Sequence, residues 1–243
     1  RARVNPLAMR LRLIDPSSLL ERIWPWARHL VGLPGLAVWA ALALGAALAA
    51  APHAGELAVA LRRAQSAPRT LALLWLILPI TKSVHELAHA LAVRRFGGSV
   101  RNAGITMLFL TPSPWVDASA ATAFPRRGAR LAVSVAGIVA DLVMAACAIC
   151  VWQSVAPGLV RDTALVTFAT CGLAALAINA NPLMRFDGYH ALTDIADLPN
   201  LALRSQAWWA DLARRALHGR DAADPVPLPR GEAKWLALYA PAS

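Results

Sequence analysis

The sequence predicts an all-α polytopic membrane protein with about four transmembrane helices. Hydrophobic residues make up 58% of the 243 residues and charged residues only 16%. The mean hydropathy of +0.49 is too high for an ordinary soluble domain. Four apolar runs are long enough for a helix to cross a hydrocarbon core of about 30 Å, which takes about 20 residues. These runs are 31–51, 71–93, 131–151 and 164–180.

The distribution of positive charge predicts the orientation of the four runs. Six arginines precede the first run, six lie between the second and third, and seven Lys or Arg residues follow the fourth. The two remaining loops carry three arginines and one. Positive charge stays on the cytoplasmic side, so both ends are expected there, in a bacterial-type inner membrane. The net charge of +10 then reflects contact with the lipid bilayer, and no nucleic-acid partner is expected.

Four segments follow along the chain. Residues 1–30 read as an interfacial segment, with a helix from about Asp15 to His29 that Pro25 interrupts. Residues 31–70 hold the first transmembrane helix and a connector, and 71–200 the core that carries the candidate site. Residues 201–243 read as an amphipathic interfacial tail that includes a proline-rich loop at 225–229. The chain lacks an initial methionine and stops within an apolar helix, so a longer protein is expected.

A small β-hairpin-like loop is expected between the second and third runs. Residues 99–110 contain Val, Ile, Thr and Phe in imperfect alternation, which is typical of short strands. Pro112 and Pro114 are expected to end the hairpin.

The second run contains the pentad His85-Glu86-Leu87-Ala88-His89. Helix positions i and i+4 share one face, so the two imidazoles can bind one ion, and in this HExxH pattern Glu86 is the general base beside a zinc-bound water. Ionisable residues are costly inside a membrane and are therefore functional candidates. His85 lies about 21 Å along the helix from Leu71, in the cytoplasmic third of the bilayer.

A hydrolytic zinc site needs three protein ligands and one open position. Asp187 is the best third candidate, because a carboxylate suits zinc and Gly188 permits a sharp backbone turn. By simple helical rise, Asp187 should lie nearer the cytoplasmic surface than His85. A break at Asn181-Pro182, or a tilted helix, is needed to bring the two together.

Two further ionisable residues lie within the apolar runs, and the sequence leaves their roles open. Asp141, in the middle of the third run, is either a hydrogen-bonded structural acid or a direct part of the chemistry. Lys82, one turn before His85, either snorkels to the interface, pairs with Asp141 or faces the site.

An HExxH pentad inside one span, followed two spans later by Asn179, Pro182 and Asp187-Gly188, resembles the site-2 protease family of intramembrane zinc metalloproteases. In that family two histidines and an aspartate bind zinc, and the glutamate is the base. The residues that match these positions are His85, His89, Asp187 and Glu86. The resemblance also implies that Asn179 helps to hold substrate, with Asn181 as a neighbour that can be confused with it.

The chain is most similar to a bacterial subgroup of peptide zinc metalloproteases. The similar stretches are Asn5-Pro6, 114–119 and 181–189, and the resemblance covers about residues 5–240. The segment around Gly137 resembles the glycine segment of the family's middle core helix, whereas Asp141 departs from the usual residue. Some members of the subgroup carry an export-adaptor-like region, which implies export-adaptor components as partners.

The expected function is hydrolysis of peptide bonds in membrane-embedded or membrane-associated substrates, with Zn²⁺ as cofactor. The hairpin is expected to pair with the substrate as an added strand, as in the family. One alternative is a non-proteolytic scaffold or export partner that retains the zinc site. Another is a transporter with His85, Glu86 and Asp141 as a proton or metal path, which leaves the Asp187-Gly188 segment unexplained.

Overall fold

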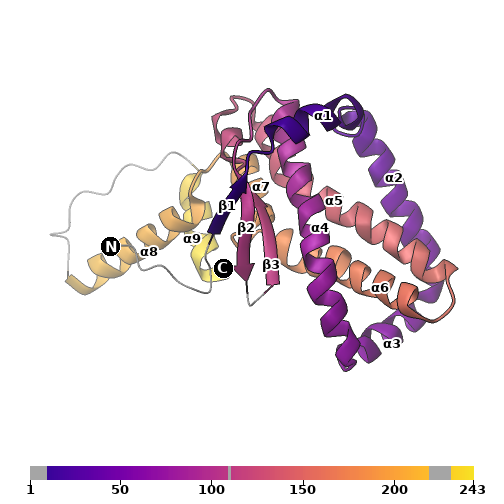
Figure 1. Ribbon diagram of the computed structural model, residues 1–243. Coiled ribbons are helices and arrows are strands. Elements are labelled where there is room, and N and C mark those ends of the chain that lie inside the picture. The colour runs from indigo at the N-terminus through magenta and orange to yellow at the C-terminus, as the bar shows by residue number, and fades with distance from the viewer. Residues whose placement is uncertain (1–9, 109–110, 219–230) are drawn as a thin grey trace.

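Four long apolar helical segments form the centre of the fold (Figure 1). The computed structural model describes residues 10–108, 111–218 and 231–243. Within them, four segments are long and apolar enough to cross a membrane, as the sequence predicts. They are Leu33–Gln65, which comprises α2 (Leu33–Ala50), η2 (Ala51–His53) and α3 (Ala54–Gln65); α4 (Pro68–Arg95); α5 (Arg127–Ser154); and Leu159–Asn179, which comprises α6 (Leu159–Phe168) and the π-helix η4 (Ala169–Asn179).

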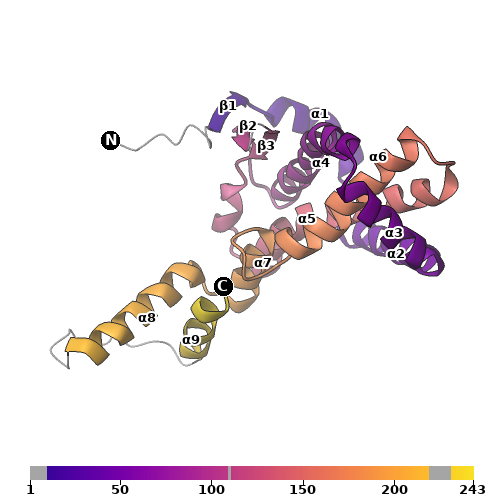
Figure 2. The same ribbon diagram turned by 90° about the horizontal axis from the view of Figure 1, so that it is seen from below.

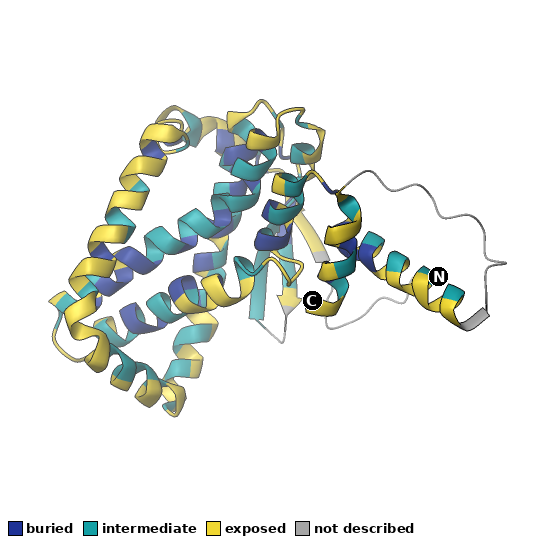
Figure 3. Cartoon of the chain, turned by 180° about the vertical axis from the view of Figure 1, so that it is seen from behind, coloured by how far each residue is buried: buried dark blue, intermediate teal, exposed yellow. Residues whose placement is uncertain are grey.

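The outer faces of these helices are exposed (Figure 3), and many of the exposed side chains are apolar. On α2, for example, Leu33 is 83% exposed and Leu48 is 66% exposed. Exposed apolar surface of this extent is unfavourable in water and suits contact with lipid. The buried side chains instead lie where α4, α5 and α6 pack together, with small residues such as Ala145 and Ala164 at the contacts.

The N-terminal segment differs from the expected one in two ways. Helix α1 (Ser17–Ala27) continues through Pro25, so the predicted interruption is wrong. Leu20 of α1 packs with Val93 of α4, and this packing outweighs the hydrogen bond that a proline forfeits close to the helix end. The preceding residues form a strand, β1 (Arg10–Ile14), that the sequence reading missed. Asn5-Pro6 lies outside the described residues.

A hairpin follows the second run as expected, but residues 99–110 do not form both of its strands: within the described residues they contribute only β2, in a three-stranded antiparallel sheet with the order β1-β2-β3. Strand β2 (Ala103–Leu108) pairs with β3 (Thr111–Val116), which lies along α4. The prediction that Pro112 and Pro114 end the hairpin is therefore wrong, because both lie inside β3. Since β3 is an edge strand, its prolines can face away from β2 without removing a hydrogen bond of the sheet. The short helix η3 (Ser119–Ala123) follows the sheet.

The last described helices form a smaller group at one end of the bundle (Figure 2). Helix α7 (Asp187–Ala196) follows the fourth apolar segment, and α8 (Leu201–His218) packs against α9 (Glu232–Ala242). Tyr189 of α7, Leu201 of α8 and Leu236 of α9 share one buried cluster. The expected amphipathic helix near 199–218 is present as α8, and the proline-rich loop at 225–229 lies outside the described residues.

Candidate metal centre

The two histidines of the pentad face each other on the inner side of α4. Nε2 of His85 lies 3.2 Å from Nε2 of His89, and the two rings meet edge to face with centroids 4.9 Å apart. Both residues are buried, at 3% and 8% exposure. The helical spacing therefore gives what the sequence predicts, which is two imidazole nitrogens directed at one point.

Asp187, the first residue of α7, completes the group. Its Oδ2 lies 3.0 Å from Nε2 of His85, and its Oδ1 lies 3.4 Å from Nε2 of His89. Among the described residues, these three are the group of His, Cys, Asp or Glu whose ligand atoms lie close enough together, within 4.8 Å, to hold a metal ion.

A break after the fourth apolar segment places Asp187 at this depth. The π-helix ends at Asn179, and the chain turns through residues 180–186 before α7 begins. Asn181 stabilises this turn, because its Oδ1 accepts a hydrogen bond from the backbone N–H of Leu183 at 2.9 Å. The break that the sequence requires is therefore present.

Neighbouring elements hold the break in place. The Tyr239 hydroxyl of α9 donates to the Pro182 carbonyl at 3.2 Å. A β-carbon at Gly188 would overlap the backbone carbonyl of Ala180, so only glycine permits this approach of α7 to the turn. Pro182, Gly188 and Asn181 thus shape the backbone that carries Asp187.

The hydrogen bonds of the two imidazoles determine where their protons lie. Nδ1 of His85 lies 2.9 Å from Oδ2 of Asp141, and Nδ1 of His89 lies 2.8 Å from the carbonyl oxygen of Val133. A carbonyl and a carboxylate oxygen are acceptors, so each Nδ1 carries a proton and donates it. In its neutral form, each imidazole then directs the lone pair of Nε2 towards Asp187.

This convergence of lone pairs fits a cation. Oδ2 of Asp187 is buried and accepts no hydrogen bond, although Nε2 of His85 lies only 3.0 Å away. With both imidazoles neutral and the Asp187 carboxyl ionised, the donor set is two nitrogens and one carboxylate, which is a set that binds divalent metals.

Gly137 of α5 provides the space that the imidazoles occupy. A β-carbon on Gly137 would lie 2.5 Å from Nε2 of both His85 and His89, which is closer than side chains approach. The family resemblance of this segment gives no reason for a glycine at position 137. The reason becomes visible only when α4 and α5 lie side by side.

Glu86 faces β3. Its Oε2 accepts a hydrogen bond from the backbone N–H of Val116 at 3.0 Å. The next residue, Asp117, donates its backbone N–H to the Asn102 carbonyl on the β2 side. Val116 therefore directs its N–H away from β2, and Glu86 lies against the outer edge of the sheet.

The structure also places the two ionisable residues whose roles the sequence left open. Asp141 is 3% exposed, and its Oδ2 accepts hydrogen bonds from His85 and, at 3.1 Å, from the side-chain amide of Asn179. Asp141 is thus a hydrogen-bonded acid next to the candidate ligand His85. Lys82 is half-buried, and within the described part of the chain it forms no ion pair with Asp141.

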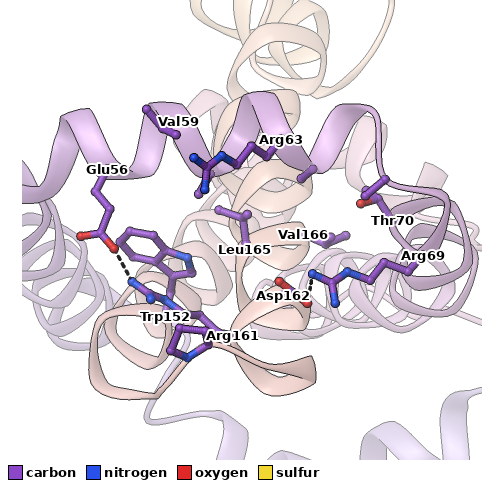
Figure 4. A pocket seen from close by; sticks show the side chains of 14 residues that line it. Glu56, Val59, Arg63, Arg69, Thr70, Trp152, Arg161, Asp162, Leu165 and Val166 are labelled. Atoms are coloured by element: carbon purple, nitrogen blue, oxygen red, sulfur yellow. Dashed lines mark hydrogen bonds and ion pairs between the residues drawn. The ribbon is translucent and has the colours of Figure 1, made fainter.

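Two pockets lie away from the His-His-Asp group. A pocket of about 310 Å³ opens between α3, the start of α4 and α6 (Figure 4). Its two acids are in ion pairs, Glu56 with Arg161 at 2.6 Å and Asp162 with Arg69 at 2.9 Å, so neither is a free base. A second pocket, of about 570 Å³ between α2, α4 and α5, has an almost wholly apolar lining. The described chemistry is therefore concentrated at His85, His89 and Asp187.

Comparison with known proteins adds no relative: no family model, curated protein or solved structure matches this chain.

Proposed function

We propose that this chain is a zinc-dependent membrane peptidase of the site-2 protease type. The observation that carries the proposal is the convergence of Nε2 of His85, Nε2 of His89 and the Asp187 carboxylate, with Glu86 adjacent to the first ligand in the chain. The pentad with a third ligand and a glutamate is the residue set of a hydrolytic zinc site.

Zinc is the metal that this donor set suits best. Zn²⁺ is commonly bound by imidazole nitrogens and a carboxylate oxygen, and three protein ligands leave a fourth position for water. When bound, zinc lowers the pKa of a water molecule to about 7 and polarises a carbonyl oxygen. The Nδ1 hydrogen bonds to Asp141 and Val133 hold both imidazoles in the tautomer that such a site requires.

Glu86 is the proposed general base. A carboxylate there takes a proton from the attacking water and delivers it to the nitrogen of the leaving amine. In the structure, the Val116 N–H holds the Glu86 side chain in place. Glu86 thus lies where the outer edge of β3 meets the helix that carries both histidine ligands.

The outer edge of β3 is the proposed docking strand for the substrate backbone. Pro112 and Pro114 have the same orientation as Val116, so their carbonyls face outward and they have no N–H groups there. The backbone N–H groups of an extended peptide would donate hydrogen bonds to these carbonyls. The one β3 donor for a peptide carbonyl among these three residues is the Val116 N–H, which donates to Glu86 in the structure. A transmembrane helix must unwind locally before it can pair in this way, so the proposed substrates are membrane-embedded or membrane-associated segments.

The proposed location is a bacterial-type inner membrane, with the site in its cytoplasmic half. The arginine distribution supports this orientation. The position of His85 agrees with it, because the histidine lies 10 residues, about 15 Å, before the Arg95 end of α4.

Metal analysis and a cleavage assay on the same preparations test the proposal. Wild type should hold about one zinc per chain, and Asp187→Ala should lose most of it. Glu86→Gln should keep the zinc and lose cleavage of a labelled transmembrane peptide. Asp211→Ala, on the exposed part of α8, is the control and should match wild type. Equal zinc in wild type and Asp187→Ala would refute the ligand set, and full zinc without cleavage in wild type would favour a non-proteolytic scaffold or export partner.

A further inference from the structure

The buried carboxylate of Asp141 lies in the middle of α5, on the side of His85 away from Asp187. Its Oδ2 accepts two hydrogen bonds, from Nδ1 of His85 at 2.9 Å and from Nδ2 of Asn179 at 3.1 Å. Within the described residues no lysine or arginine pairs with it. A buried carboxyl group is costly at this depth unless its oxygens are hydrogen-bonded, and the two donors here are the candidate ligand His85 and Asn179.

We propose that Asp141 is a positioning residue of the metal centre, and that Asn179 positions Asp141 instead of binding substrate. This inference rests on the metal site of the proposed function but not on peptidase activity. Asp141 acts through His85. It holds the imidazole in the Nδ1-protonated tautomer, orients the ring and makes Nε2 a stronger donor.

Geometry excludes Asp141 as a direct ligand. The two nitrogens of an imidazole point in different directions, and Asp141 contacts Nδ1 whereas Asp187 lies at Nε2. A metal held between His85, His89 and Asp187 therefore has the His85 ring between itself and Asp141. This arrangement resolves the two roles that the sequence left open for Asp141.

Asn179 occupies the last position of the π-helix η4, which follows α6 directly. π-Helical segments are rare in proteins and are frequently found at functional sites. Here the amide of Asn179 donates to the same oxygen that accepts from His85, so it fixes that oxygen in line with the imidazole. The family resemblance implies substrate binding for Asn179, whereas the contacts show an amide engaged with Asp141.

Zinc affinity tests the inference without relying on cleavage. Asp141→Asn keeps an acceptor oxygen and the shape of the side chain but removes the charge, and Asp141→Ala removes both. Thr81→Val is the matched control, because Thr81 is buried one turn before His85 and its hydroxyl donates to carbonyls of its own helix, those of Ile77 and Leu78. Affinity is measured by competition with a chelator in detergent, and the visible spectrum of Co²⁺-loaded protein reports the coordination geometry.

Loss of a residue that orients a ligand typically weakens metal binding 10–100-fold. We expect about 100-fold weaker zinc binding for Asp141→Ala, about 10-fold for Asp141→Asn and Asn179→Ala, and wild-type affinity for Thr81→Val. The Co²⁺ spectrum should shift in the Asp141 variants. Thermal unfolding of the metal-free variants checks folding, and Asp141→Asn carries the test if Asp141→Ala does not fold.

Each result has a distinct meaning. Zinc binding by both Asp141 variants as tight as that of Thr81→Val overturns the positioning role and leaves the proposed function intact. If Asn179→Ala keeps full zinc affinity but loses cleavage, Asn179 binds substrate and does not position Asp141. A wild type that binds no zinc overturns both the inference and the proposed function. Zinc binding that depends on Asp141, without any cleavage of peptide, supports the positioning role of Asp141 and refutes the proposed peptidase function.

Discussion

Substitution of Gly137 by alanine should destroy the metal centre without unfolding the bundle. A β-carbon at this position lies 2.5 Å from Nε2 of both His85 and His89, whereas ordinary contact begins at 3.4 Å. The imidazoles must therefore retreat by the difference, about 0.9 Å. Metal–ligand distances tolerate deviations of only about 0.2 Å, so both nitrogens would leave the positions that an ion requires.

The helix itself should accept the alanine. Alanine is more favourable than glycine in a helix interior by roughly 0.5–1 kcal/mol, which offsets part of the local repacking. We therefore expect Gly137→Ala to fold and to bind zinc at least about 100-fold more weakly than wild type, beyond the range seen when only a supporting residue is lost. The assay is chelator competition, followed by thermal unfolding with and without zinc.

Gly45 of α2 offers the matched control. It also lies within an apolar helix, and a β-carbon there meets nothing within 4 Å. Gly45→Ala should bind zinc like wild type, and zinc should raise its unfolding temperature as it does in wild type. Wild-type zinc affinity in Gly137→Ala would show that the imidazoles do not form the site in this arrangement.

Three further variants test other parts of the site. Gly188→Ala places a β-carbon against the backbone of the chain break, so α7 should shift and zinc content should fall in metal analysis; retained zinc would contradict this account of the break. Val116→Pro removes the backbone N–H that donates a hydrogen bond to Glu86, and it removes no hydrogen bond between β2 and β3. Peptide cleavage should therefore fall about 10-fold or more at constant zinc content. Unchanged cleavage would show that the hydrogen bond between Val116 and Glu86 does not matter for activity. Arg130→Met removes two ion pairs that link α5 to the end of α7, with Asp194 at 3.1 Å and with Asp197 at 2.8 Å, so the melting temperature should drop by a few degrees in a thermal scan. An unchanged value would show that the two pairs together contribute no net stability.

Local patterns in the sequence predicted those features that depend on one helix at a time. The apolar runs gave the four spans, and the i, i+4 spacing gave the facing imidazoles of His85 and His89. The position of Asp187 near the histidines was predictable, because Pro182 favours a break in the helix and Gly188 permits a sharp turn next to the carboxylate. These are signals with a short range along the chain.

Features that depend on contacts between distant segments were not predictable from one sequence. Strand β1 pairs with β2 about 90 residues later, and nothing near Arg10–Ile14 announces that partner. The prolines of β3 argue against a strand until its place at the edge of the sheet is known. In the same way, the roles of Gly137 and Asp141 follow from the packing of α5 against α4. Gly137 leaves space for the two imidazoles, and Asp141 accepts a hydrogen bond from His85.

Two helices together hold the imidazoles of the candidate site, which explains how two polar rings can be directed at one ion in so apolar a place. Helix α4 presents both Nε2 atoms, and α5 accepts both Nδ1 protons through Asp141 and the Val133 carbonyl. Without α5, each imidazole would leave an N–H unsatisfied in the interior, at a cost of several kcal/mol in an apolar medium. The face of α5 that packs against α4 therefore belongs to the candidate metal centre together with the pentad. Substitution of residues on this face should weaken zinc binding even when His85, His89 and Asp187 are unchanged.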